Sequence, residues 1–250
     1  MAATKEERQK KYIRRGFRYD QEAVRPQAIN REQGVKNHEI STFVAHSDHH
    51  VIKAPNTPYD GTKVGKTVTA APLSYKPRNT VGSPAKNSIH KELMNAINQG
   101  GSSYARGHLL GDQLHGPGDK EWNLTPIPQT QNLQMVGDIE GPIAKAINRK
   151  KNKNAVRNRK KQNQVYYYQI DAQYNEAEHE PQTIPHKLLA SEFVIKYGPY
   201  SEEEIETNKN LRKQTWGEPN VLYHYKLPLA KPKIEEQEKL VEGEYQQQTP

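Results

Sequence analysis

The chain has 250 residues, a formal net charge of +8 and a pI of about 9.3, and this excess of Lys and Arg favours a polyanionic partner such as nucleic acid. Because it contains no cysteine, disulfides, cysteine-based zinc sites and cysteine nucleophiles are excluded. It has no apolar run of about 18 residues and no apolar signal segment after Met1, so we expect no membrane partner and no Sec signal, with synthesis in the cytoplasm and any export left to a dedicated secretion or injection system.

Composition divides the chain into three parts. Residues 1–40 are charged and rich in Gln and Asn, and we interpret them as an arm that a partner orders or that is disordered. Residues 41–230 hold enough apolar positions for one folded domain, and residues 231–250 read as a polar tail. Near the start of the domain, Pro55, Pro58 and Asp60-Gly61 indicate turns.

Strands and a first helix are predicted next along the chain. Val64 to Tyr75 is typical of a strand because apolar residues alternate among threonines. Ser88 to Gln99 has apolar residues at helical spacing, with Ser88 as its cap and Gly100-Gly101 as its end. Ala105 to Leu110 and Trp122 to Ile127 predict two short strands on either side of a Gly-Pro-Gly loop.

A second helix should begin at Thr130, which can cap it. Its apolar positions are Leu133, Val136, Ile139, Ile143 and Ile147. Pro142 conflicts with this pattern and should kink or break the helix. Three strands follow, at residues 165–174, 193–197 and 221–225, so the pattern predicts an α+β fold with a central, mainly antiparallel sheet.

The segment around His108 carries the residues that phosphodiester hydrolysis needs. A histidine ring can take a proton from an attacking water, because its pKa lies near neutrality. His108 ends a predicted strand beside Gly107, where a ligand can approach the backbone closely. The alternative for His108 alone is a structural histidine with its hydrogen bonds satisfied.

Two oxygen-bearing side chains of the second helix could hold a divalent cation. Mg²⁺ prefers oxygen ligands, and the Asn132 amide oxygen is one. Glu140 lies eight residues further on, which is roughly two helical turns, so we expect it on the same face. Each alone has a simpler explanation, since an Asn at a helix start is usually a cap and a Glu on a helix is usually solvated.

Arg106-Gly107-His108 with Asn123, Asn132 and Glu140 at these spacings resembles the DNA/RNA non-specific endonucleases, which are sugar-non-specific nucleases with a ββα-metal (His-Me finger, HNH-like) core. The segment from Arg106 to Ile127 looks most like members found as toxin domains of bacterial polymorphic toxins and as contractile-injection-system effectors. The resemblance implies an α+β nuclease domain over residues 41–230 and a ββα-metal catalytic core within it.

The resemblance also implies residue roles. His108 would be the general base, Asn123 would orient the site and Arg106 would support the phosphate. Asn132 would bind Mg²⁺ or Mn²⁺ directly, and Glu140 would act through a metal-bound water. His115 would be an accessory residue that contacts phosphate or caps the Gly-Pro-Gly loop, and the loop role is favoured.

The implied activity is metal-dependent cleavage of DNA, and of RNA as a second substrate, with little sequence preference. A toxin of this kind would need an immunity protein or a delivery-particle component as its partner. One departure is Ala105, where many family members have Asp before Arg-Gly-His. This departure supports the alternative of a non-catalytic module that binds nucleic acid or serves as cargo.

A basic run, Arg149 to Lys161, has eight Lys or Arg residues in thirteen. It either tracks phosphates or forms a solvated face, and its candidate nucleic-acid contacts are Lys150, Lys151, Lys153, Arg157, Arg159, Lys160 and Lys161. Asp60 to Thr67 fails the P-loop pattern because only three residues separate its glycines. His46 and Asp48-His49-His50 could bind a transition metal, but a polar loop is favoured.

Overall fold

The computed structural model describes residues 40–99, 103–148, 164–174, 188–210 and 216–229. The predicted arm, apart from Ile40, and the predicted tail lie outside the described residues. The elements, in chain order, are β1 (Val44–Val51), β2 (Lys63–Leu73), α2 (Lys91–Asn98), β3 (Tyr104–His108), β4 (Leu124–Pro128), α3 (Gln129–Met135), a π-helical turn (Val136–Glu140), α4 (Gly141–Ile147), β5 (Tyr166–Tyr174), β6 (Ala190–Pro199), α5 (Glu202–Asn210) and β7 (Tyr223–Pro228). Two 3₁₀ turns, Asp112–Leu114 and Glu121–Asn123, lie between β3 and β4.

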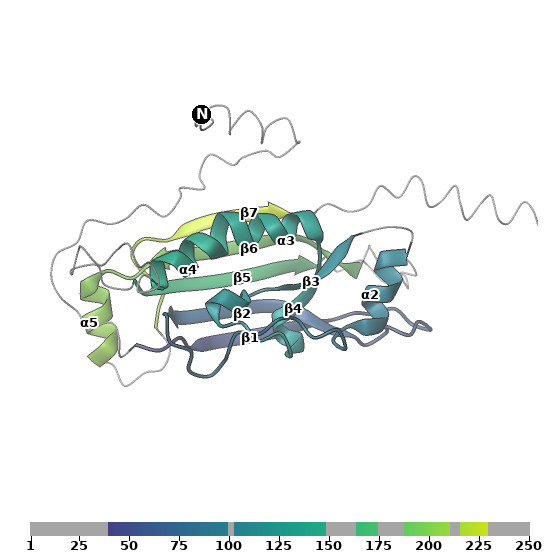
Figure 1. Cartoon of the computed structure of the whole chain (residues 1–250), viewed down its shortest axis with the longest axis horizontal. Coiled ribbons are helices and arrows are strands. Elements are labelled where there is room, and N and C mark those ends of the chain that lie inside the picture. The colour runs from purple at the N-terminus through teal and green to yellow at the C-terminus, as the bar shows by residue number, and fades with distance from the viewer. Residues whose placement is uncertain (1–39, 100–102, 149–163, 175–187, 211–215, 230–250) are drawn as a thin grey trace, which may run out of the picture.

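The centre of the molecule is a five-stranded sheet in the order β1-β2-β5-β6-β7 (Figure 1). Every neighbouring pair in it is antiparallel. The predicted α+β fold with a mainly antiparallel sheet is therefore confirmed. The strands predicted at residues 64–75, 165–174, 193–197 and 221–225 are its strands β2, β5, β6 and β7.

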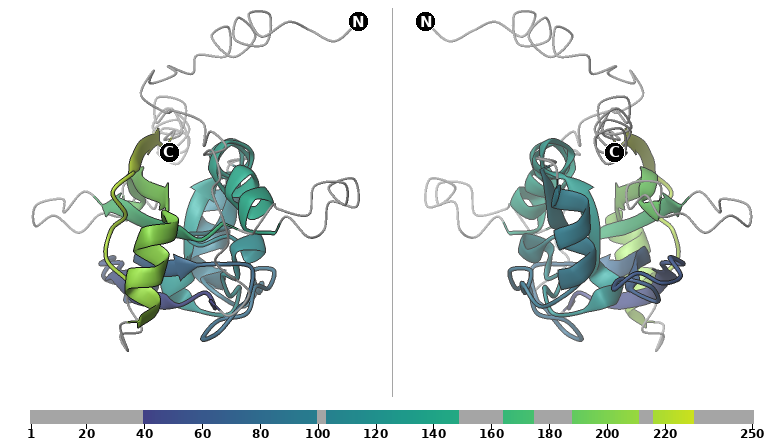
Figure 2. Two further views of the ribbon diagram at one scale, coloured as in Figure 1. Left: turned by 90° about the vertical axis from the view of Figure 1, so that its left-hand side faces the viewer. Right: turned by 90° about the vertical axis from the view of Figure 1, so that its right-hand side faces the viewer.

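A second layer covers one face of this sheet. It consists of the β3–β4 hairpin, α2, and the continuous helix made by α3, the π turn and α4, all of which lie on the same side (Figures 1 and 2). The hairpin forms a separate two-stranded sheet, so its strands pair only with each other. Pro126 and Pro128 are tolerated in β4 because a strand with one partner has a free edge.

The main core lies between the two layers. Strand β5 contributes by simple alternation, with Tyr166, Tyr168 and Ile170 on the buried face. They pack against Met135, Ile139 and Ile143 of the helix, among others, in one hydrophobic cluster. Tyr166 and Tyr168 are buried in this core, so their rings are not exposed for stacking on bases.

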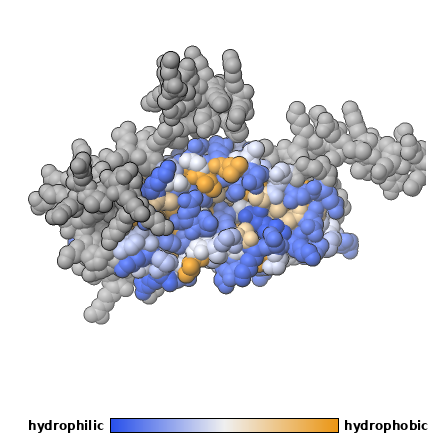
Figure 3. Space-filling model, in the orientation of Figure 1, coloured by the Kyte–Doolittle hydropathy of each residue, from blue (hydrophilic) through white to orange (hydrophobic). Residues whose placement is uncertain are grey.

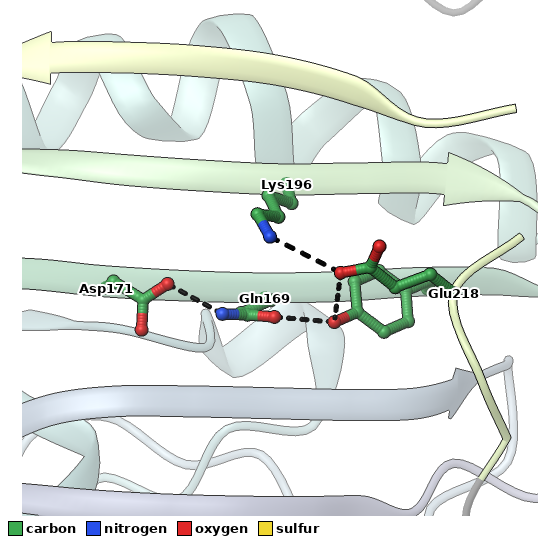
Figure 4. A network of polar contacts seen from close by, with 5 residues as sticks. Gln169, Asp171, Lys196 and Glu218 are labelled. Atoms are coloured by element: carbon green, nitrogen blue, oxygen red, sulfur yellow. Dashed lines mark hydrogen bonds and ion pairs between the residues drawn. The ribbon is translucent and has the colours of Figure 1, made fainter.

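The other face of the sheet carries a polar network (Figure 4). Tyr167 donates to Gln169 over 2.5 Å, and the Gln169 amide donates to Asp171 over 2.7 Å. Lys196 on β6 forms an ion pair with Glu218 at 3.3 Å. These side chains therefore bond to one another on the face of the sheet opposite the β3–β4 hairpin.

Three helix predictions are corrected. The first helix begins at Lys91, not Ser88, and His90 precedes it in a left-handed conformation (φ 53°) with no side-chain cap. The second begins at Gln129, so Thr130 is inside it rather than its cap. Leu133 was predicted to face the core but is 61% exposed. Figure 3 shows a small apolar patch on this side of the molecule, over the α3–α4 helix. Gln131 and Met135 are the buried positions, and Leu133, two residues from each, points to the opposite side.

Two elements were missed, and one bend takes an unexpected form. Strand β1 is largely exposed and lacks apolar alternation, and α5 has a run of Glu instead of an apolar stripe. At Pro142 the helix does not break but widens into the π turn directly before it. None of the helices within the described ranges has both the length and the apolar character needed to cross a bilayer.

Candidate active site

The β3–β4 hairpin and α3 form a compact ββα unit. In the hairpin, Arg106 lies opposite Pro126 and His108 lies opposite Leu124. The chain passes directly from Pro128, the last residue of β4, into α3 at Gln129. The helix therefore packs back against the strand that carries His108.

His108 is half-buried at the end of β3, and its Nε2 lies 3.0 Å from the Ser83 carbonyl oxygen. A carbonyl only accepts hydrogen bonds, so Nε2 carries the proton and Nδ1 keeps its lone pair in the neutral ring. Burial lowers the pKa of His108, although the Ser83 hydrogen bond and the charge of Asp112 act in the opposite direction. The ring is thus held as a neutral base with one fixed tautomer.

The Ser83 segment is itself held in place by the loop after β3. The Ser83 backbone N–H donates to the Gly116 carbonyl over 3.2 Å, and its hydroxyl accepts from the Gly118 N–H over 2.8 Å. A side chain at Gly82 would collide with the Asp112 carbonyl, so the two segments are in close contact. No sequence pattern indicates that Ser83 positions His108, because the contact is made by a backbone carbonyl 25 residues away.

Arg106 lies two residues before His108 and so projects from the same face of β3. Its Nε donates to the Ile89 carbonyl over 2.6 Å, which fixes the direction of the guanidinium. Partial burial lowers the pKa of Arg106, but an arginine remains charged at neutral pH. Within the described residues its terminal amines have no assigned hydrogen bond, so they can meet an anion.

Asn132 and Glu140 both reach toward β3 and the loop that follows it. A Cβ placed on Gly107 would lie 3.2 Å from Oδ1 of Asn132. A Cβ placed on Gly111 would overlap the carboxylate of Glu140. The two side chains therefore pack against glycines on either side of His108 in the sequence.

Glu140 is 2% exposed, and its Oε1 has no hydrogen-bond partner among the described residues. Burial, together with the nearby charge of Asp112, raises its pKa to about 8. A buried carboxylate oxygen without a partner is unfavourable unless a cation or a proton meets it. The oxygen pair from Asn132 and Glu140 fits a hard divalent cation, although the described residues contain no group of three or more His, Cys, Asp or Glu that could hold a metal by themselves.

Asn123 lies just before β4, whereas the sequence prediction placed it within the strand from Trp122 to Ile127. It is fully buried in the 3₁₀ turn before β4, and its amide oxygen accepts from the Leu110 N–H over 2.8 Å. Its amide nitrogen donates to the carbonyls of Leu110, over 3.0 Å, and Pro117, over 3.1 Å. Asn123 thus ties both ends of the loop between β3 and β4, and an orienting role would act through that loop.

His115 occupies the same loop in a left-handed conformation, with φ 74°. Its Nε2 lies 3.0 Å from the Ser74 carbonyl at the end of β2. This contact holds the loop against the segment that follows β2. Asp112, in the same loop, was not singled out from the sequence, yet its charge acts on both His108 and Glu140.

The remaining sequence features are placed as follows. Ala105 is partly buried against the main core, so a carboxylate there would lose hydration. His46, Asp48, His49 and His50 lie in β1 rather than in the predicted loop, and the described residues form no metal cluster there. Lys150, Lys151, Lys153, Arg157, Arg159, Lys160 and Lys161 lie outside the described residues.

A family model described as DNA/RNA non-specific endonuclease matches residues 65–188. The match begins within β2 and ends just before β6, so it contains the whole ββα unit. It also contains His108, Asn132 and Glu140. No curated protein matches the chain.

The three buried hydrogen bonds of Asn123 yield a stability prediction. Asn123→Ala leaves the buried N–H and carbonyl of Leu110 without partners, which should lower the free energy of unfolding in urea by at least about 2 kcal/mol. Asn79→Ala is the matched control, because Asn79 bonds both the N–H and the carbonyl of Val44 over 3.0 Å but is exposed, so water can replace it. Equal losses in the two variants would contradict a buried clamp.

The raised pKa of Glu140 yields a pH prediction for the metal-free protein. Folding favours the protonated carboxyl, so this contribution is present below pH 4.5 and is lost as the pH rises toward about 8. In EDTA, Glu140→Gln should therefore exceed wild type in unfolding free energy by roughly 2–4 kcal/mol at pH 8. At pH 4.5 the two should be nearly equal in urea titrations. A difference that does not change with pH would contradict this account.

Proposed function

The chain belongs to the DNA/RNA non-specific endonuclease family, and we propose that it hydrolyses DNA, and RNA as a second substrate, by a divalent-metal-dependent mechanism with little sequence preference. The observation that carries the proposal is the fixed tautomer of His108. Its Nε2 is committed to the Ser83 carbonyl, so Nδ1 is a neutral base. It lies in a ββα unit whose helix brings two oxygen ligands against β3 and the loop that follows it.

Asn132 and Glu140 are the residues that would hold the cation, either directly or through water. The fit rests on the unpartnered buried oxygen of Glu140 and on the preference of Mg²⁺ and Mn²⁺ for amide and carboxylate oxygens. When bound, such a cation would neutralise the negative charge that develops on the phosphate and the leaving oxygen.

The chain's own residues account for the other steps. Nδ1 of His108 accepts a proton from water as the water oxygen bonds to phosphorus. The bond from phosphorus to the 3′ oxygen breaks, which leaves a 5′-phosphate and, after protonation by solvent, a 3′-hydroxyl. Arg106, held by the Ile89 carbonyl, would contact the non-bridging oxygens of the phosphate through its terminal amines.

Little sequence preference is expected because the proposed contacts are all to phosphate. Arg106 bonds phosphate oxygens, which carry no base identity. We further propose that the basic run, Arg149 to Lys161, adds phosphate contacts along the strand. Cleavage should then weaken steeply as salt rises, for DNA and RNA alike.

The test is cleavage of plasmid DNA and total RNA by wild type and His108→Ala, with Mg²⁺ and with EDTA. Loss of a general base should slow cleavage by about 10²- to 10⁴-fold. The control is His46→Ala, because His46 is exposed on β1 and should not affect cleavage. EDTA should abolish the wild-type activity.

Two results would contradict the proposal. Retained cleavage by His108→Ala would mean that another group is the base. If neither protein cleaves but both retard the nucleic acid on a gel in a salt-sensitive way, the chain is a non-catalytic binding or cargo module.

The similarity of the segment from Arg106 to Ile127 to toxin domains supports a second part of the proposal, that the enzyme is a bacterial toxin or effector with an immunity protein or delivery component as partner. Induced expression in a bacterium without that partner should then reduce viable counts, and His108→Ala should relieve the effect. Equal growth with wild type and His108→Ala, at equal soluble levels, would contradict a toxin role.

A further inference from the structure

The helix that carries Asn132 and Glu140 has the wrong spacing for a regular α-helix. Eight residues advance about 800°, which is about 80° beyond two whole turns. On a continuous α-helix, Glu140 would therefore point well away from the direction of Asn132. Yet both side chains pack against the β3 side, one at Gly107 and the other at Gly111.

The π turn resolves this difference. Across Val136–Glu140 the Gly141 N–H donates to the Val136 carbonyl, five residues back instead of four. A turn closed at five residues holds one more residue than an α turn, so the eight residues rotate like about seven, or 700°. Glu140 then lies within about 20° of Asn132 when viewed down the helix axis.

Gly141 and Pro142 are the residues that permit this turn. Pro142 has no N–H, so it cannot form the bond to Asp138 that would hold regular α-helical spacing at this point. Gly141 has only a hydrogen where a Cβ would come within 3.0 Å of the Val136 carbonyl oxygen. The pair therefore favours widening over continuation as an α-helix.

The widening adds a residue without disturbing the core on either side. Met135 before the turn and Ile139 and Ile143 within and after it are buried in the same hydrophobic cluster. Gly137 contributes little to the packing of the helix, because it is exposed and a Cβ there would meet nothing within 4 Å. The helix thus behaves as a regular one with a single extra residue at its outer surface.

We infer that the π turn formed at Gly141 and Pro142 is a positioning device that aligns Glu140 with Asn132 so that both face one divalent cation. This inference rests on the proposed function. Its consequence is that the rotation between the two side chains, and not their separation by eight residues, determines metal binding. A regular α-helix in which the two residues are separated by seven positions instead of eight should serve equally well.

The test is deletion of Gly137 in the full-length protein. The Gly141 N–H then reaches Val136 at the regular spacing of four residues, and Asn132 and Glu140 stay aligned. Mn²⁺ affinity from isothermal titration should equal that of the length control, Gly137→Ala, and plasmid cleavage should be retained. Insertion of one alanine after Gly137 should instead rotate Glu140 away and weaken Mn²⁺ binding by about 10- to 100-fold.

Thermal unfolding of each variant completes the experiment. The deletion should unfold at a temperature no lower than that of Gly137→Ala. The inference is overturned if the deletion weakens Mn²⁺ binding as much as the insertion does, whether or not it remains folded, or if the insertion binds normally. Failure of the wild-type protein itself to bind Mn²⁺ would overturn the proposed function, and the inference with it.

Discussion

Close packing of one helix against β3 and the loop after it is the constraint on which the site depends. A side chain at Gly107 of β3 would crowd Asn132, and a side chain at Gly111 in the loop after β3 would displace Glu140. With hydrogens there, the amide and the carboxylate come up to the backbone on either side of His108. His108, Asn132 and Glu140 come together in one unit because glycine at these two positions leaves room for the two side chains.

Two buried polar side chains that meet the loop after β3 differ in whether their hydrogen bonds are satisfied. Asn123 has its amide oxygen and nitrogen fully engaged, so it fixes the loop and has little capacity left for a ligand. Glu140 has an oxygen with no partner among the described residues and a pKa raised to about 8. A satisfied buried group rigidifies a structure, whereas an unsatisfied one is available to a ligand.

The sequence predicted the features that depend on local pattern. Strands β2, β5, β6 and β7 follow from alternation, and the grouping of His108, Asn132 and Glu140 follows from motif spacing. It could not predict Ser83, because a backbone carbonyl has no side-chain signature and its approach depends on a loop contact at Gly118. It missed β1 because the strand is polar, and it placed Leu133 inside because periodicity alone does not fix which side of a helix is buried.

Pro142 shows why the sequence could identify the candidate site residues but could not predict how they are oriented. Sequence reasoning treats a proline in a helix as a defect, and a count of eight residues as roughly two turns. Each statement is inaccurate alone, yet the errors are linked, because the widening before the proline removes the rotation that the count of eight leaves over. The sequence does not reveal that link, because it depends on a hydrogen bond from the Gly141 N–H to the Val136 carbonyl. A local departure from ideal geometry, the π turn, therefore orients the side chains that we propose for cation binding, and the regular sheet behind it provides the buried area that makes such a departure tolerable.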